Sequence, residues 1–325
     1  MHVLIVGAGA VGQVYGYHFA QGGAQVTFLV KPHHVPNLQK PLRLLRHGLI
    51  RRSLKEVQFQ DFDLVSDMAD IPADIDQVWL TMASDALGED WLQALKTALP
   101  GTANVVGLQP GIEDDALLEG VFGDRALKGV IGFLAYQYPL PYAKDAKGRE
   151  GIAYLLPPSA GGLGPSDHLA VQQAVGALDD GGLKIAPSDT LGETYGRVSA
   201  LSITHMAALE VADWSFKGLR KNTNLARDLA RRAAEEAMAI VDVHQGREVD
   251  AQNKTLAKGG PLVATVAPWV APLPIEAYLE FHFSKVGQQT RDMLIAYQRI
   301  GRNHNLSISA LQELSAALIK RDEMS

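Results

Sequence analysis

The first 187 residues alternate between short apolar runs and longer amphipathic stretches. The apolar runs at 3–6, 25–30, 77–81 and 103–108 predict strands, and the pattern over 91–99 predicts a helix. Such alternation is typical of an α/β fold, a parallel sheet with helices on both faces. Further strands are predicted at 128–138 and 151–156, as a hairpin at the sheet edge around an exposed loop at 139–150. A crossover helix near 167–178 and a last strand at 183–186 complete this Rossmann-type domain, 1–187.

After Pro187 the strand signals stop, and helical periodicity predicts an all-α second domain over 188–325. We expect its helices at 189–213, at 223–245 with a cap at Asn222 or Thr223, at 277–299 and at 309–320. The apolar stretch 259–274 contains several prolines and cannot form one regular helix. It is interpreted as a packed surface loop, with a lid or the contact of a homodimer as alternatives.

The turn after the first strand has the pattern G-x-G-x-x-G. In this context Gly7 allows the tight turn, Gly9 lets the backbone approach a pyrophosphate, and Gly12 lets the next helix pack on the sheet. Ala8, Ala10 and Val11 complete the turn, and the helix N-terminus receives the phosphates. The sequence therefore predicts a dinucleotide-binding site; the alternative is a glycine-rich turn without a ligand.

The end of the second strand indicates which dinucleotide. An acid about 20 residues past the glycines would hold a ribose 2′-hydroxyl, but the first acidic residue of the whole chain is Glu56. Lys31 ends this strand instead, and a cation there suits a 2′-phosphate. We predict NADP(H) as the cofactor, with Lys31 as the phosphate contact and Arg43 or Arg46 as less favoured partners. The alternative is that Lys31 is an ordinary solvated lysine.

Composition narrows the function classes. The net charge of −6 argues against a general nucleic-acid binder, and no apolar run approaches the length of a membrane span. With no basic segment before the first strand, we expect no secretory signal and a cytoplasmic location. The absence of cysteine excludes disulfides and thiolate chemistry, and no residue spacing indicates a metal site. The basic stretch 43–55 alternates with leucines and predicts an amphipathic hairpin that turns near Gly48.

The opening glycine motif, Lys31, the segment Leu108-Gln109-Pro110-Gly111 and the helical second half together resemble the ketopantoate reductase family. This resemblance implies an NADPH-dependent reductase that delivers hydride to a 2-oxo acid between its two domains. It also implies a helical domain similar to the C-terminal one of 6-phosphogluconate dehydrogenases.

Several positions depart from the family's pattern. Met82 stands where the family has a lysine that contacts cofactor and substrate, and Pro110, after Gln109, replaces an asparagine on the nicotinamide side. The family's catalytic lysine falls near Arg197, with Tyr195 in place of a tryptophan, and the acidic motif expected around 282–292 has no clear counterpart. We therefore expect the substrate to be a carbonyl compound other than ketopantoate.

Reduction of a carbonyl also needs a proton donor. Arg197 can hold a carboxylate or polarise the carbonyl, but its pKa makes it a poor acid. His205 lies eight residues further along the same predicted helix and is our candidate donor. The structural alternatives are an ion pair of Arg197 with Glu193 and a half-buried His205. A second polar stripe that could line the cleft, or be merely solvated, is His282, Lys285, Gln289 and Asp292.

The resulting hypothesis is an NADPH-dependent oxidoreductase that reduces a small 2-oxo acid or related carbonyl compound. A first alternative is an NADP(H)-binding protein without turnover, with a regulatory or interaction role, because the glycines are intact while the family's polar positions are replaced. A second alternative is reduction of an imine, as in opine-type dehydrogenases. Fold analogy does not separate these three.

Overall fold

The computed structural model describes residues 1–48, 53–141, 148–221, 226–258 and 273–323. The chain divides into two compact units, Met1–Leu191 and Gly192–Ser325. Among the described residues, no helix is long and apolar enough to cross a membrane.

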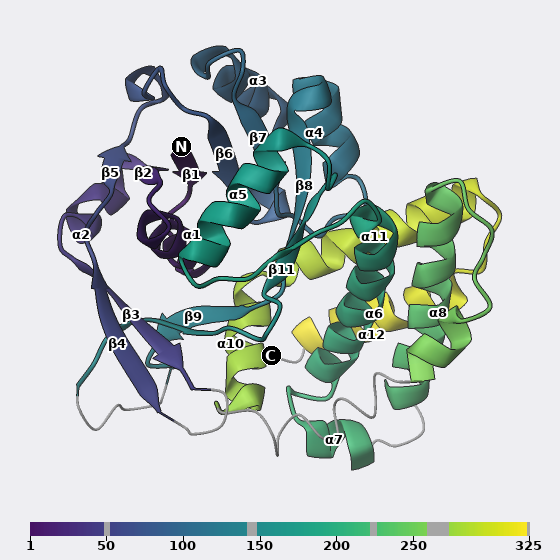
Figure 1. The fold of residues 1–325 in the computed structure, drawn as a ribbon. Helices are drawn as coiled ribbons and strands as arrows, with labels where there is room; N and C mark the ends of the chain where they lie inside the picture. Colours follow the sequence, from purple (N-terminus) through teal and green to yellow (C-terminus); the bar gives the residue numbers. More distant parts are fainter. Residues whose placement is uncertain (49–52, 142–147, 222–225, 259–272, 324–325) are drawn as a thin grey trace. The chain divides into compact units, whose positions relative to one another are not determined.

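The first unit is built on an eight-stranded sheet (Figure 1). Its strand order is β12-β11-β8-β7-β6-β1-β2-β5, and the six strands from β8 to β5 are parallel. From β1 the chain fills one side of the sheet with β2 and β5 and then crosses to β6, β7 and β8 on the other side, which is a doubly wound topology. The strands are β1 His2–Val6, β2 Gln25–Leu29, β5 Asp63–Val65, β6 Gln77–Leu80, β7 Asn104–Gly107, β8 Ala126–Ile131, β11 Gly161–Gly164 and β12 Ala186–Pro187.

Helices cover both faces of this sheet, as the alternating pattern predicts. Because successive side chains of a strand point to opposite faces, Val3 and Ile5 of β1 pack into one core and Leu4 and Val6 into the other. The first core contains α1 (Ala10–Gln21) and α5 (Leu169–Asp180), and the second contains α3 (Glu89–Ala98) and α4 (Asp114–Phe122). Short helical segments are α2 at Val35–Leu38 and 3-10 turns at Pro32–His34, Met68–Asp70, Ser84–Ala86 and Gly123–Arg125.

A second sheet of four strands packs against α1. The predicted amphipathic hairpin is confirmed as β3 (Leu42–His47) and β4 (Leu54–Phe59), with the Gly48 N–H donating to the Ser53 carbonyl at 3.0 Å. β9 (Leu134–Tyr138) pairs with β10 (Gly151–Leu155), and β10 pairs with β3.

The predicted hairpin is confirmed as the antiparallel pair β9 and β10. The prediction that 128–138 is one strand and that the hairpin lies at the edge of the main sheet is wrong. The chain leaves the main sheet after β8, at Gly132, and β9 belongs to the second sheet. A Cβ on Gly132 would lie 2.7 Å from the Gly161 N atom, so only glycine allows this close backbone approach. The last strand is also shifted, to Ala186–Pro187, and β11 was not predicted because its sequence, Gly-Gly-Leu-Gly, lacks the residues that favour strands.

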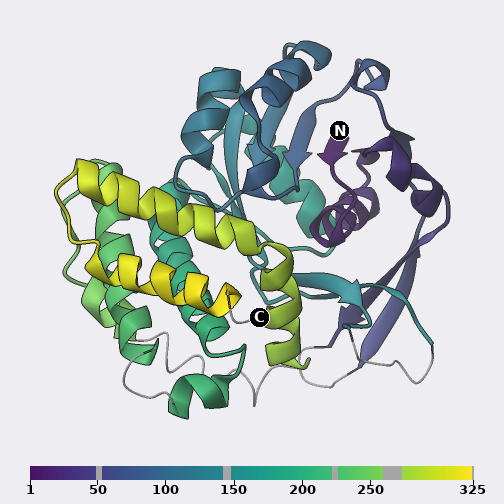
Figure 2. The ribbon, with the colours of Figure 1, turned by 180° about the vertical axis from the view of Figure 1, so that it is seen from behind.

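The second unit is helical, as predicted, and α8, α11 and α12 pack on one another (Figure 2). The expected single helix 277–299 is two helices, which are separated at Val286. His282 and Lys285 therefore lie on α10 while Gln289 and Asp292 lie on α11, and the predicted stripe is not one helical face. The helices are α6 Leu191–Val211, α7 Phe216–Lys221, α8 Ala226–His244, α10 Ile275–Lys285, α11 Gly287–Asn303 and α12 Ser309–Asp322.

Two predictions fall on positions outside the described residues. They are the helix cap at Asn222 or Thr223 and most of the apolar stretch 259–274. The proposed lid or dimer contact therefore stays a prediction.

Candidate functional site

Four parallel strands of the first unit end at the same level. Val6 of β1 stands beside Leu29 of β2 and Leu80 of β6, and Leu80 stands beside Gly107 of β7. Ligands of open α/β sheets bind outside these carboxyl ends, where the strand order reverses. All the predicted cofactor residues follow these strand ends closely in the chain: Gly7, Ala8, Gly9, Ala10, Val11, Gly12, Lys31, Met82, Gln109 and Pro110.

The glycine turn connects β1 to α1 and is fixed by backbone contacts. Gly7 has a φ of +96°, which favours glycine, and its N–H donates to the Leu29 carbonyl at 2.9 Å. The Gln13 side-chain amide donates to the Ala8 carbonyl at 2.8 Å. These bonds hold the turn against the ends of β1 and β2.

Gly9 and Gly12 serve different purposes in this turn. A Cβ on Gly12 would lie 2.1 Å from the Gly7 carbonyl oxygen and 2.8 Å from Thr81 Oγ1, so Gly12 is required for packing. A Cβ on the exposed Gly9 would meet nothing within 4 Å. The space in front of Gly9 is therefore open to a ligand, as the predicted approach of a pyrophosphate requires.

The N-terminus of α1 suits an anion. Gly9 is its N-cap and has no side chain to cap the helix, and the first turn contains no acid. The first N–H groups of a helix lack intrahelical partners and carry partial positive charge. Lys31 follows β2 as an exposed side chain two residues past Leu29, the residue that binds Gly7. The start of α1 and the Lys31 side chain, both positive, thus follow neighbouring strand ends at this edge.

Polar side chains tie the strand ends together. The Thr81 hydroxyl lies 2.8 Å from the Val6 carbonyl oxygen and 2.9 Å from that of Gly7, and so joins β6 to β1. The buried Gln109 side chain donates to the carbonyls of Leu80, at 3.0 Å, and Met82, at 2.8 Å. Gln109 is thus a bracing residue whose amide points into the protein.

A second brace follows at the start of α4. One carboxylate oxygen of Asp114, Oδ2, accepts hydrogen bonds from Ser84 Oγ and from the Gly111 N–H, both at 2.7 Å. Burial raises the pKa of Asp114, against the opposing effect of these two bonds. The neighbouring Asp115 pairs instead with Lys128 of β8. Sequence reasoning missed Thr81, Ser84 and Asp114 because no motif marks them, although an acid three residues after Gly111 is typical of a helix start.

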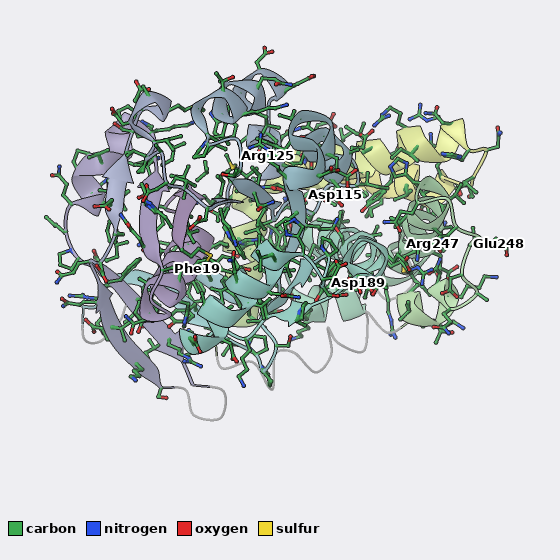
Figure 3. All side chains as sticks on the ribbon, turned by 45° about the horizontal axis from the view of Figure 1, so that its top comes forward. Phe19, Asp115, Arg125, Asp189, Arg247 and Glu248 are labelled. Atoms are coloured by element: carbon green, nitrogen blue, oxygen red, sulfur yellow. The ribbon has the colours of Figure 1, made fainter. Side chains whose placement is uncertain are left out.

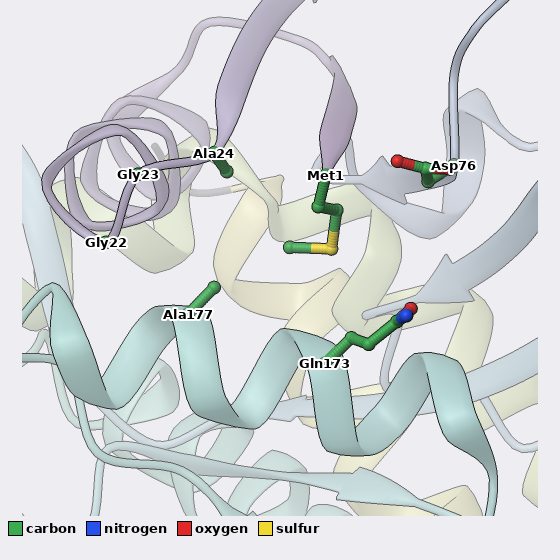
Figure 4. Close-up of a pocket in the computed structure, with 7 residues that line it drawn as sticks. All are labelled: Met1, Gly22, Gly23, Ala24, Asp76, Gln173 and Ala177. Atoms are coloured by element: carbon green, nitrogen blue, oxygen red, sulfur yellow. The ribbon is translucent and has the colours of Figure 1, made fainter.

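A pocket of about 310 Å³ lies elsewhere in the first unit (Figure 4). Met1, Ala24 and Asp76, which line it, precede β1, β2 and β6 respectively, so it lies at the amino ends of the strands. Gly22, Gly23 and residues of α5 complete its wall. The pocket is on the opposite edge from the glycine turn and is not the predicted cofactor site.

In the second unit Arg197 faces α8 rather than Glu193. Its Nε donates to Asp242 Oδ1 at 2.7 Å and its Nη1 to Asp250 Oδ2 at 2.8 Å. The alternative of an ion pair with Glu193 is wrong, because Glu193 pairs with Arg247 at 3.3 Å. Arg247, labelled in Figure 3, lies just past the end of α8. Burial by itself would lower the pKa of Arg197. Its two carboxylate partners, Asp242 and Asp250, have the larger effect together and raise that pKa.

Asp242 is the centre of this network and is fully buried. Besides Arg197, it accepts hydrogen bonds from Arg247 at 3.0 Å, the Asp250 N–H at 3.1 Å and the Asn253 amide at 2.7 Å. Burial opposes ionisation, yet the bonds from Asp250, Asn253 and Arg197 outweigh it and lower the pKa of Asp242. A buried carboxylate with four donors holds the segment after α8 against α6.

His205 lies on α6, 9% exposed. Its Nδ1 lies 2.8 Å from the Leu201 carbonyl oxygen, which identifies Nδ1 as the protonated nitrogen, and Nε2 is buried without a hydrogen-bond partner among the described residues. Burial lowers the pKa of His205 despite the bond to Leu201. The catalytic roles of Arg197 and His205 stay predictions.

The glycine turn, the helix N-terminus behind it and the doubly wound sheet are those of a dinucleotide-binding domain, and the comparisons place it among the oxidoreductases that act on a carbonyl or CH–OH group. The sequence comparison specifies the family. Residues 3–139 match the family model of ketopantoate reductase PanE/ApbA. A search among curated proteins gives no significant match.

Solved structures with the same fold match the whole chain. A PanE/ApbA family ketopantoate reductase from Ralstonia eutropha JMP134 is 18% identical, with a TM-score of 0.73 over 100% of this chain and 99% of the other. A 2-dehydropantoate 2-reductase from Methylococcus capsulatus is 17% identical, with a TM-score of 0.72 over 100% and 97%. D-mandelate dehydrogenase, in complex with NADH and anilino(oxo)acetate, is 18% identical, with a TM-score of 0.73 over 100% and 99%.

Proposed function

We propose that this protein is an NADPH-dependent reductase of a small 2-oxo acid or related carbonyl compound other than ketopantoate. The observation that carries the proposal is the arrangement at the carboxyl edge, where an open approach to Gly9 and an uncapped helix N-terminus lie beside an exposed Lys31. A phosphate group suits such a surface. D-mandelate dehydrogenase, a protein of the same fold, was solved with NADH and an oxo acid, anilino(oxo)acetate.

The pyrophosphate and the 2′-phosphate of the cofactor each have a feature of the chain that suits them. The N–H groups at the start of α1 would bind the pyrophosphate, and Lys31 would bind the 2′-phosphate of the adenosine ribose. The reduced nicotinamide supplies the hydride when the cofactor is bound. Met82 and Pro110, in the loops after β6 and β7, lack the lysine and asparagine side chains of the family pattern. That difference supports a substrate other than ketopantoate.

His205 is the proposed proton donor, and Arg197 is proposed to hold the substrate carboxylate or polarise its carbonyl. His205 would act through Nε2, which has no hydrogen-bond partner in the described part of the chain. Because burial lowers the pKa of His205, this imidazole is mostly neutral at pH 7, and carbonyl reduction should become faster as the pH falls. Arg197 would use N–H groups other than those bound to Asp242 and Asp250.

Lys31→Asp tests the cofactor assignment. A charge-assisted bond to a phosphate contributes about 1.5–3 kcal/mol, so the variant should lose about tenfold or more in NADPH affinity while NADH affinity changes little. Lys40→Asp, at another exposed lysine, makes the same change of charge and is the matched control. An unchanged ratio of NADPH to NADH affinity in Lys31→Asp would refute Lys31 as the phosphate contact.

A panel of 2-oxo acids, ketones and imines, assayed by loss of reduced-nicotinamide absorbance, tests the reaction. Oxidation of NADPH with one class of carbonyl compound is the expected result. His205→Gln should then lower the turnover number and flatten its dependence on pH. Oxidation with imines alone would move the assignment to the opine type.

A binding protein without turnover is the second candidate. The observation that favours it is that Arg197 is held by two carboxylates and that His205 is buried. NADPH binding without oxidation by any member of the panel, together with a cofactor-dependent change in oligomeric state, would establish this alternative.

A further inference from the structure

The carboxyl edge contains a hydrogen-bonded clamp that the glycine motif does not require. Asp114, on the first turn of α4, accepts from Ser84 in the segment after β6 and from the Gly111 N–H in the segment after β7. One carboxylate oxygen thus joins two loops that belong to neighbouring strands. Gln109 joins the same two loops closer to the sheet, through the Leu80 and Met82 carbonyls.

The place of this clamp in the fold gives it a role. A doubly wound sheet consists of two mononucleotide-binding halves. Here β1, β2 and β5 form one half, with the glycine turn and Lys31, and β6, β7 and β8 form the other. If the adenosine half of the cofactor lies over the first set of strands, the nicotinamide half lies over the ends of β6 and β7. This step rests on the proposed function.

We propose that Asp114 is a positioning residue for the nicotinamide half of the cofactor. Its carboxylate fixes the loops after β6 and β7, which carry Met82 and Pro110, before the cofactor binds. Pro110 has no backbone N–H to donate, and the N–H of the next residue, Gly111, donates to the Asp114 carboxylate at the start of α4.

Variants of the clamp test the proposal with two ligands, NADPH and 2′-phospho-ADP-ribose, which lacks the nicotinamide. Asp114→Ala should weaken NADPH binding about tenfold relative to the wild type, and Ser84→Ala about fivefold, because hydrogen bonds to a charged group are lost. Binding of 2′-phospho-ADP-ribose should stay within about twofold, because the adenosine half and Lys31 are unchanged. Ser84→Ala keeps the experiment informative if Asp114→Ala does not fold.

Asp115→Ala is the matched control. It removes a carboxylate from the adjacent residue, which pairs with Lys128 and not with Ser84 or Gly111. The ratio of the two affinities should therefore stay at the wild-type value. If the ratio of NADPH affinity to 2′-phospho-ADP-ribose affinity is unchanged in both Asp114→Ala and Ser84→Ala, the proposal is overturned. This holds when neither ligand binds more weakly and also when both are weakened equally, which would indicate a general role in folding. Failure of the wild type to bind either ligand would instead refute the proposed function, and the positioning role with it.

The pH dependence of the ratio supplies a readout that a purely structural role would not affect. The carboxylate accepts the bonds from Ser84 and Gly111 best when ionised; the nearby charges are Asp115, which raises its pKa, and Lys128, which lowers it. As the pH falls and Asp114 takes up a proton, the preference for NADPH over 2′-phospho-ADP-ribose should decrease. Titration of the 2′-phosphate cancels because both ligands carry it. In Asp114→Asn the ratio should not vary with pH, and a wild-type ratio that is independent of pH would count against the clamp.

Discussion

The carboxyl edge of the first unit and the Asp242 network of the second use polar groups in opposite ways. At the edge, the first turn of α1 has no side-chain cap and Lys31 is exposed. In the network, the buried Asp242 has four donors and Arg197 has two carboxylate partners. The edge therefore leaves hydrogen-bonding capacity for a ligand, while the network uses most of its own capacity to hold α6, α8 and the segment after α8 together.

The largest effect is expected when the network is broken at its centre. Asp242→Asn removes the charge that balances Arg197, and loss of one partner from a buried ion pair costs about 3–5 kcal/mol. Urea unfolding should show this as a lower midpoint. Cofactor affinity should stay unchanged if the variant remains folded, since the glycine turn lies in the first unit. A variant as stable as the wild type would show that the network does not stabilise the second unit.

The wild type and Asp242→Asn should also differ in how their stability depends on pH. The pKa of Asp242 is lower in the folded protein than the usual value of about 3.9. Its stabilising contribution is therefore complete above that usual pKa and is lost as the pH falls through the folded-state pKa. The difference in unfolding free energy between wild type and Asp242→Asn should be constant near neutrality and shrink under acid. A difference that grows as the pH falls would contradict the assignment.

The glycine turn offers a comparison within the edge itself. Gly12→Ala places a Cβ 2.1 Å from a backbone oxygen, so overpacking should destabilise the first unit by about 1–3 kcal/mol and weaken NADPH binding. Gly9→Ala meets no neighbouring atom, so it should lower the melting temperature much less than Gly12→Ala does, by the loss of a glycine N-cap alone, while it weakens NADPH binding. Equal effects of the two variants on stability, or normal binding by Gly9→Ala, would refute the open approach at Gly9.

The smallest effect is expected at Glu193. This residue is exposed and contacts Arg247 at the rim of the network, so Glu193→Gln should change the unfolding free energy by about 0–1 kcal/mol. A loss as large as that of Asp242→Asn would show that Glu193, rather than Asp242, balances the arginines.

The glycine turn was predictable because its roles follow from local geometry, as Gly7 and Gly12 confirm. The alternation of strands and helices was predictable too, since each strand is a short apolar run. Contacts between distant segments were not predictable: Asp242 and Asp250 lie 45 and 53 residues from Arg197. For the same reason the helical spacing that favoured Glu193 as partner of Arg197 was misleading, and the second sheet, in which β10 pairs with β3, was missed.

The most direct test of the account is titration of the wild-type protein with NADPH and with NADH, followed by the fluorescence of the reduced nicotinamide. If the carboxyl edge is an NADP(H) site with Lys31 on the 2′-phosphate, NADPH should bind saturably and about tenfold or more tighter than NADH. Equal affinities for the two cofactors would contradict the role of Lys31, and no saturable binding of either would contradict the assignment of the site itself.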